Sequence, residues 1–428
     1  MMKIERFFAG CCLLLFISVL GLNAQSPKFD WNKTLRVDFT LVGNFQYQKA
    51  YISKIMTYQC SFGSEKQMIS PFDFGEYRYF IIDSEKGDTL FMRGFSTLFE
   101  EWRIVDEAKR KQRAFEQSIE MPMPLIKVHL VVESRLRDGT FTILFEEDIN
   151  ANDLEVIRFR PYYYPSRVIS GDDQPESKFD ILFVADGYRD DQAEIFFNQV
   201  KKLSSELLNI EPYKTYKESI TIRAIAAPSM QSGPDDPRSG KWRNTILSST
   251  FNTFGVDRYL ETEATWKVFD VAAQEPHDHI IVLVNSDKYG GGGIYNHFSV
   301  VTAHHHSSAK VLIHEMGHGI GGLGDEYYGA EVSYNDFINL DIEPWQPNLT
   351  TLVNFDSKWK HLVDEKTPIP TPVRPMYKNT TGVFEGGGYV SKKVYRPAIN
   401  CRMRSNEAEG FCEVCKDVLR RTILFYTL

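Results

Sequence analysis

Residues 314–327 read HEMGHGIGGLGDEY, and this stretch decides the fold of the C-terminal part of the chain. His314 and His318 lie four residues apart, so on a helix both imidazoles project from one face and can bind one metal ion. Glu315 stands beside the first histidine, where its carboxylate can hold a water molecule against that ion. The spacing is typical of a zinc hydrolase, with Zn²⁺ on the two histidines and Glu315 as the catalytic residue.

The residues around the histidines predict a helix that ends in a sharp turn. Leu312, Met316 and Ile320 recur every four residues and would bury one stripe of this helix. Glycine then occupies four of the six positions after His318. Because glycine ends helices and adopts left-handed backbone conformations, we expect the chain to turn here and to bring a third ligand back towards the metal.

The position of the third zinc ligand is predicted from the spacing after this turn. A catalytic zinc site has three protein ligands and leaves one position for water. In the short-spaced zinc peptidases, the metzincins, the third ligand follows a glycine by three residues. Gly321 matches that glycine, but the ligand position is Gly324, which has no side chain. We therefore predict Asp325 as the third ligand, with Glu326 as the alternative. A gluzincin ligand on a later helix ranks low because Glu331 lies too close.

Three segments of the sequence together resemble the bacterial IgA-specific metallo-endopeptidase family. They are residues 314–327, the run Asn285-Ser286-Asp287-Lys288-Tyr289 with its following glycines, and the run Asn400-Cys401-Arg402-Met403-Arg404. The resemblance covers about residues 177–428, and the preceding region resembles the β-rich domain that often precedes the peptidase in this family. It implies a secreted zinc endopeptidase of metzincin-like fold, with immunoglobulin or another host protein or glycoprotein as candidate substrates.

Met403 lies in a segment that resembles the tight methionine turn beneath the zinc of metzincins. Such a turn supplies a soft hydrophobic floor and no ligand. The alternative is that Met403 is an ordinary core residue. Tyr327 and Tyr328 follow the predicted ligand turn, and either could stabilise the oxyanion of a peptide bond under attack.

Length and composition fit a soluble protein of two domains. The chain has 428 residues, of which 43% are hydrophobic, so it can bury at least one large core. Its formal net charge is −8, and no run of lysine and arginine stands out. A nucleic-acid partner is therefore not expected, whereas a protein or peptide substrate is. The sequence leaves the oligomeric state open.

Residues 1–24 have the pattern of a secretory signal peptide. Lys3 and Arg6 give a positive start, residues 7–22 are mostly apolar, and Leu22-Asn23-Ala24 is an acceptable cleavage site. The expected location is secreted, periplasmic or at the cell surface. No later stretch is long and apolar enough to predict a transmembrane segment after signal removal.

Four cysteines remain after the predicted signal peptide. They are Cys60, Cys401, Cys412 and Cys415. In an oxidising compartment we expect a disulfide between Cys401 and either Cys412 or Cys415, since all three lie within one short segment. The alternative is a second metal, for which the Cys-x-x-Cys spacing is suitable, but the sequence shows no second pair of ligands nearby.

Residues 25–165 are predicted to form an antiparallel β-sandwich-like accessory domain. Alternating apolar residues and turn signals indicate strands at residues 35–41, 78–82, 89–92, 127–132 and 140–145. A charged insert at residues 100–116 is expected to be a helix or a loop. Nothing in the pattern assigns this domain more than a structural or accessory role.

Residues 166–178 form the predicted linker, because prolines and Gly171 are poor material for a helix or central strand. The pattern then becomes α/β, which predicts an α/β metzincin-like zinc peptidase domain over residues 179–428. Apolar runs predict buried strands at 179–184, 220–225 and 279–284, with a helix at 190–208. A strand at 294–303 is predicted to lie at the sheet edge and dock substrate. The glycine run before it, residues 290–293, would let the chain approach closely or move as a lip over the site, or it is an exposed hairpin turn.

The predicted activity is hydrolysis of peptide bonds by Glu315-assisted attack of a zinc-bound water, with zinc held by His314, His318 and Asp325. The alternative is a surface-associated binding or adhesion protein with a vestigial peptidase domain. The intact Glu315 argues against that alternative, since zinc binding alone does not need this carboxylate.

Overall fold

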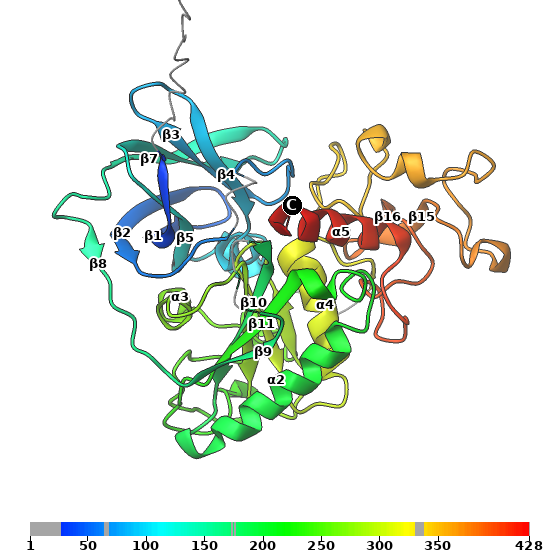
Figure 1. Ribbon diagram of the computed structural model, residues 1–428. Coiled ribbons are helices and arrows are strands. Elements are labelled where there is room, and N and C mark those ends of the chain that lie inside the picture. Colours follow the sequence, from blue (N-terminus) through cyan, green and yellow to red (C-terminus); the bar gives the residue numbers. More distant parts are fainter. Residues whose placement is uncertain (1–26, 64–67, 173, 175–176, 330–337, 428) are drawn as a thin grey trace, which may run out of the picture.

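The computed structural model describes residues 27–63, 68–172, 174, 177–329 and 338–427 (Figure 1). The predicted signal peptide, residues 1–24, lies outside the described residues, as does Glu331. A β-rich N-terminal part packs against a mixed α/β C-terminal part, as the sequence predicts. Within the described ranges, every helix is too short or too polar to span a lipid bilayer.

The N-terminal part contains two four-stranded sheets, ordered β5-β1-β2-β8 and β4-β3-β6-β7. The strand pairs are antiparallel except β2 with β8, which is parallel. The strands are β1 (Phe29–Gly43), β2 (Gln48–Tyr58), β3 (Tyr77–Asp83), β4 (Thr89–Phe95), β5 (Arg113–Pro124), β6 (Val128–Arg135), β7 (Phe141–Ile149) and β8 (Ile157–Arg158).

The two sheets enclose one hydrophobic core. Alternate residues of β1 point into it, and Leu35, Val37 and Phe39 are fully buried. The predicted charged insert begins as helix α1 (Leu98–Arg103), which Thr97 caps by accepting a hydrogen bond from the backbone N–H of Glu100. The insert then continues into β5.

The C-terminal part is built on a six-stranded sheet of order β13-β14-β12-β10-β11-β9. The four central strands run parallel and the two edge strands antiparallel to their neighbours. The strands are β9 (Ser166–Ser170), β10 (Phe179–Asp186), β11 (Ile220–Ile225), β12 (His279–Val284), β13 (Gly291–Gly293) and β14 (Phe298–Thr302).

Helices cover both faces of this sheet. The first face packs against α2 (Ala193–Leu207), α4 (Ser308–Gly321) and α5 (Glu413–Thr427), and α3 (Thr265–Ala272) covers the other. Alternate residues of β10 serve the two sides, because Phe183 faces the α4 side and Val184 the α3 side. The strand is buried along its whole length, as its continuous apolar run predicts.

The described residues between α4 and α5, 322–329 and 338–412, are mostly irregular and lie on one side of the molecule (Figure 1). They contain the two-stranded sheet of β15 (Phe384–Gly387) and β16 (Val390–Arg396). Short 3₁₀ turns occur at Asp106–Lys109, Asp190–Gln192, Lys217–Ser219, Pro237–Ser239, Thr253–Gly255, Phe355–Ser357, Lys360–Leu362 and Pro375–Tyr377.

The predicted linker, residues 166–178, is in part a strand. Its first five residues form β9, which pairs antiparallel with β11 at the sheet edge. Pro165 precedes this strand and Gly171 follows it, so the residues that suggested a linker are the ends of an edge strand. The crossing between the two parts therefore lies between β8 and β9.

The prediction of an edge strand at residues 294–303 was wrong. β14 lies inside the sheet, between β12 and β13, and the edge strand is the glycine run Gly291–Gly293. Glycine is required there by close packing: a Cβ on Gly293 would lie 2.6 Å from the backbone oxygen of Glu315 in α4. The glycines indicate close approach of a strand to the helix that carries the histidines.

Candidate metal centre

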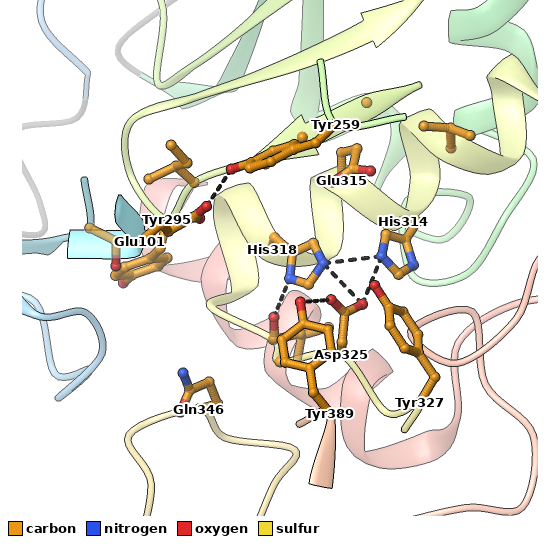
Figure 2. Close-up of a pocket in the computed structure, with 18 of the residues that line it drawn as sticks. Glu101, Tyr259, Tyr295, His314, Glu315, His318, Asp325, Tyr327, Gln346 and Tyr389 are labelled. Atoms are coloured by element: carbon orange, nitrogen blue, oxygen red, sulfur yellow. Dashed lines mark hydrogen bonds and ion pairs between the residues drawn. The ribbon is translucent and has the colours of Figure 1, made fainter. Parts of the chain in front are cut away.

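Helix α4 carries the two histidines and ends where the glycines predict. Its buried stripe is Leu312, Met316 and Ile320, which are at most 2% exposed. Gly322 ends the helix in the left-handed conformation, with φ of 58°. Its backbone N–H donates to the carbonyl of His318, and the chain then reverses so that Asp325 faces the histidines (Figure 2).

Three side-chain atoms converge at this point. Asp325 Oδ1 lies 3.0 Å from His314 Nε2 and 3.4 Å from His318 Nε2, and the two nitrogens are 3.1 Å apart. Around a tetrahedral zinc with bonds of about 2.0–2.1 Å, ligand atoms lie roughly 3.3 Å from one another. The structure therefore brings together His314, His318 and Asp325 at separations that suit a common metal ion.

Backbone carbonyls fix the orientation of both imidazoles. His314 Nδ1 donates to the carbonyl of Arg402 at 3.0 Å, and His318 Nδ1 donates to that of Leu323 at 2.5 Å. A carbonyl only accepts, so Nδ1 carries the proton and the neutral ring presents a lone pair at Nε2. In these neutral tautomers neither Nε2 carries a proton for Asp325 Oδ1, which then has no hydrogen-bond donor among the described residues. This set of acceptors fits a divalent cation with nitrogen and oxygen ligands.

The pKa shifts of the three residues show that the Asp325 carboxylate favours positive charge on the two histidines. Burial lowers the pKa of His318, but the charge of Asp325 outweighs it and raises that pKa to about 9. Burial likewise lowers the pKa of His314, and the hydrogen bond with Asp325 raises it above its ordinary 6.5. Burial raises the pKa of Asp325, yet the charge of His318 holds it well below 3.8. Protons thus balance the carboxylate, and a metal would replace them.

Glu315 lies between the histidines and the edge strand β13. One carboxylate oxygen is within 4.8 Å of a ring nitrogen of each histidine. Its two oxygens would lie 3.0 and 3.1 Å from a Cβ on Gly291 and Gly293, so only glycine leaves room for the carboxylate. Burial raises the pKa of Glu315 above 4.5, against the lowering effect of the histidine charges. A raised pKa brings a carboxylate closer to the range of a general base.

Met403 packs directly beneath the histidine helix. The side chain is fully buried, and its sulfur would lie 2.4 Å from a Cβ on Gly317, the residue before His318. The same turn supplies the Arg402 carbonyl that orients His314. This placement is compatible with the hydrophobic floor expected of a methionine turn.

Three residues near the ligands were not singled out from the sequence. Tyr389 donates a hydrogen bond from its hydroxyl to Asp325 Oδ2, and Arg258 interacts with Tyr327 and with the charge of Asp325. Glu261 is buried, which raises its pKa well above 4.5, and the nearby charge of Glu315 raises that pKa further. Arg258 and Glu261 lie in the loop before α3, and Tyr389 lies between β15 and β16. All three are far in the chain from the metal ligands, so no local spacing could reveal them.

The N-terminal part contributes to the same cleft. Glu76, Ser96 and Glu101 line it together with the metal-centre residues. Tyr259 of the α/β part donates a hydrogen bond to Glu101, and Trp345 donates from Nε1 to Glu76 at 3.0 Å. Of the two tyrosines after the turn, Tyr327 lines the cleft, whereas Tyr328 is 43% exposed.

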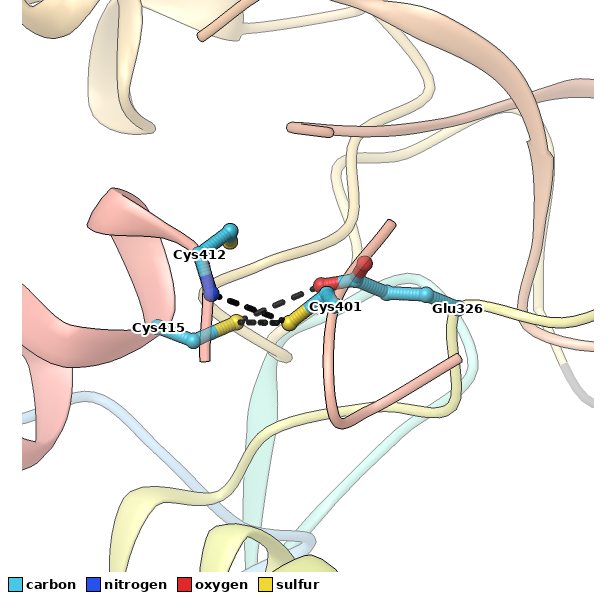
Figure 3. Close-up of side chains that lie close together, drawn as sticks. All are labelled: Glu326, Cys401, Cys412 and Cys415. Carbon is cyan, nitrogen blue, oxygen red and sulfur yellow. Dashed lines mark hydrogen bonds between the residues drawn. The ribbon is translucent and has the colours of Figure 1, made fainter. Parts of the chain in front are cut away.

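Glu326, the alternative ligand, points away from the histidines and towards cysteines (Figure 3). Its Oε1 lies 3.2 Å from Cys415 Sγ. The predicted disulfide is not formed: Cys401, Cys412 and Cys415 are all free thiols in the described part of the chain. The sulfurs of Cys401 and Cys415 are 3.7 Å apart, whereas a disulfide bond is about 2.05 Å long.

A helix with two histidines and a glutamate, closed by an acidic turn beside a sheet edge, is the arrangement of a metallopeptidase. The chain belongs to the IgA Peptidase M64 family, whose model matches residues 169–379 and 374–423. A second family model, Peptidase M64 N-terminus, matches residues 27–146. A search of curated proteins found no match. The resemblance predicted from the sequence is confirmed, and with it the class of metallopeptidase.

Proposed function

We propose that this metallopeptidase is a zinc-dependent endopeptidase that acts outside the cytoplasm on a protein substrate. The observation that carries the proposal is the convergence of His314 Nε2, His318 Nε2 and Asp325 Oδ1, within 3.0–3.4 Å of one another. We assign these three residues as the zinc ligands. The predicted signal peptide supports a secreted, periplasmic or cell-surface location.

The metal and the chain have separate tasks in the proposed reaction. A zinc ion on these ligands would lower the pKa of a coordinated water and polarise the scissile carbonyl. Glu315 accepts the proton of the attacking water on its carboxylate and later delivers it to the leaving amine. Its position beside the histidines and its raised pKa support this role.

Neighbouring residues would hold the ligands and the substrate. The Tyr389 hydroxyl keeps the second oxygen of Asp325 occupied, so that Oδ1 is free to face the metal. We assign oxyanion stabilisation to Tyr327, which lines the cleft next to Arg258. Tyr328 is excluded from this role because it does not line the cleft.

The edge strand β13 is the proposed docking site for the substrate backbone. Gly292 and Gly293 line the cleft, and one edge of the strand pairs with β14. On the other edge Gly291 already pairs with Tyr259 in an isolated bridge, so an extended peptide can add through main-chain hydrogen bonds beyond it, beside Gly292 and Gly293. An antiparallel edge strand beside the histidine helix, followed by a glycine turn and a methionine turn, supports the proposal of a metzincin-like fold.

Elemental analysis and a peptide-library cleavage assay on the same samples test this function. Glu315→Gln should keep the metal content of the wild type and lose at least about 100-fold in kcat/KM, since a general base contributes roughly 10²–10⁴. Asp325→Asn should lose one metal ion per chain together with activity. Full cleavage by Glu315→Gln, or an unchanged metal content in Asp325→Asn, would contradict the assignment.

A further inference from the structure

A second cluster of metal-ligand side chains lies behind the predicted catalytic centre. It consists of Glu326, Cys401, Cys412 and Cys415, each offering one ligand atom within 4.8 Å of the others (Figure 3). We propose that these four residues form a second, structural zinc site. This proposal is independent of the proposed peptidase reaction.

The geometry of the cluster suits a closed tetrahedral site. Structural zinc takes four protein ligands, commonly three or four of them cysteine sulfurs at about 2.3 Å, which places sulfurs about 3.8 Å apart. Cys401 Sγ and Cys415 Sγ are 3.7 Å apart, and Cys415 Sγ lies 3.2 Å from Glu326 Oε1. The sequence alone showed three cysteines, and the fold supplies the fourth ligand from a distant turn.

The buried carboxylate of Glu326 calls for a cation. This side chain is fully buried, and its Oε2 has no hydrogen-bond partner in the described ranges. A buried carboxyl oxygen without a partner is expensive in free energy. The buried Arg396 lies near it but donates from Nη1 to the carbonyls of Glu385 and Gly386. A zinc ion would bind the carboxylate and the sulfurs together.

Hydrogen bonds around the cluster resemble those that support metal ligands. The backbone N–H of Cys412 donates to Cys401 Sγ at 3.3 Å, and Asn348 Nδ2 donates to Glu326 Oε1 at 3.0 Å. Such outer contacts orient ligating atoms and stabilise negative charge on them. A disulfide between two of the three cysteines would leave the third thiol and the carboxylate buried together with no common ligand.

The site would connect three segments, two of which build the predicted catalytic centre. Glu326 follows Asp325 directly, Cys401 precedes the turn that holds Met403, and Cys415 lies in the first turn of α5. The backbone N–H of Glu326 already donates to the carbonyl of Met403 at 2.8 Å. A metal bound here would hold the Asp325 turn and the methionine turn in register.

The test is the metal content of a His314→Ala/His318→Ala double variant of the whole chain. This variant removes the predicted catalytic site, so one remaining zinc per chain is the expected result. Adding Cys412→Ser and Cys415→Ser should remove it, whereas Cys60→Ser, a buried cysteine elsewhere, should not. If the double variant contains no zinc, the proposal is overturned, whether or not the wild type cleaves peptides.

Two further measurements keep the test decisive if the serine variants do not fold. Cobalt exchanged into the double variant should give thiolate-to-cobalt charge-transfer absorption in the near ultraviolet, and its absence would contradict thiolate ligation. Alkylation during unfolding without reductant, followed by peptide mapping, should find Cys401, Cys412 and Cys415 as thiols. A Cys401–Cys415 disulfide in that map would contradict the metal site, because two of its ligands would be bonded to each other.

Discussion

At the scale of single residues, the feature hardest to predict was which of Asp325 and Glu326 faces the histidines. Both carboxylates follow the glycine turn, and either could be the third ligand by spacing. Successive side chains of an extended segment point in opposite directions, so only one of the two can face the histidines. The structure turns Asp325 to the histidines and Glu326 to the cysteines.

A residue-scale prediction concerns Tyr389. Tyr389→Phe removes the hydroxyl that donates to Asp325 Oδ2, so the carboxylate loses the contact that orients it. Loss of an outer contact of this kind typically weakens metal binding or activity by about 10–100-fold. The affinity of the histidine site, measured by competition with a zinc chelator, should fall within that range.

Tyr328→Phe is the matched control for this prediction. Tyr328 stands next to Tyr327 but is exposed and does not line the cleft. It should leave both metal affinity and kcat/KM unchanged. If the two variants behaved alike, the contact between Tyr389 and Asp325 would have no role in the site.

At the scale of elements, the strands and the histidine helix could be predicted because their patterns are local. The predicted strand at residues 179–184 lies within β10, and the predicted helix end lies in the glycine run that ends α4. The strand β13 could not be predicted from local pattern, because it consists of glycines. These glycines are needed to make room for Glu315, which belongs to a different element. The same holds for Tyr389 and Arg258, which only the tertiary fold brings to the ligands.

An element-scale prediction concerns the contact between α4 and the methionine turn. In Gly317→Ala the new Cβ would lie 2.4 Å from Met403 Sδ. Overpacking typically costs about 1–3 kcal/mol, and the better helix propensity of alanine offsets about 1 kcal/mol of this. We expect a lower free energy of unfolding and a lower melting temperature.

Gly410→Ala is the control, because its Cβ would meet Ile210 at an ordinary 3.6 Å. Combining Gly317→Ala with Met403→Ala should cost less than the sum of the two single changes, since the smaller side chain makes room for the methyl group. Additive costs would show that Met403 does not limit the space beneath the histidine helix.

At the scale of the whole molecule, the N-terminal part is packed into the peptidase part. Ile294, just after β13, is buried in the core of the N-terminal sandwich. Arg36 of β1 forms an ion pair of 2.7 Å with Asp270 of α3, and Trp266 Nε1 donates to the carbonyl of Gln117. With Glu76 and Glu101 in the cleft, this part shapes the site as well as supporting it.

The interface between the two parts also contains a buried pair that should make stability depend on pH. His277 Nε2 lies 3.0 Å from Glu120 Oε2, and both side chains are less than 10% exposed. Burial lowers the pKa of His277, but the charge of Glu120 raises it above 6.5. Burial raises the pKa of Glu120, but the charge of His277 lowers it below 4.5. The pair is therefore ionised between these limits.

Glu120→Gln should destabilise the protein most between pH 4.5 and 6.5, by about 3 kcal/mol, because it leaves a buried histidine without its counter-charge. The contribution of His277 is complete below 6.5 and is lost as the pH rises through its raised pKa. The contribution of Glu120 is complete above 4.5 and is lost as the pH falls through its lowered pKa. Melting temperatures of wild type and variant across this range measure the difference.

Glu413→Gln, which breaks an exposed pair with Lys416, is the control and should show almost no difference in melting temperature. A constant difference at every pH would mean that the two domains are not joined by an ionised pair.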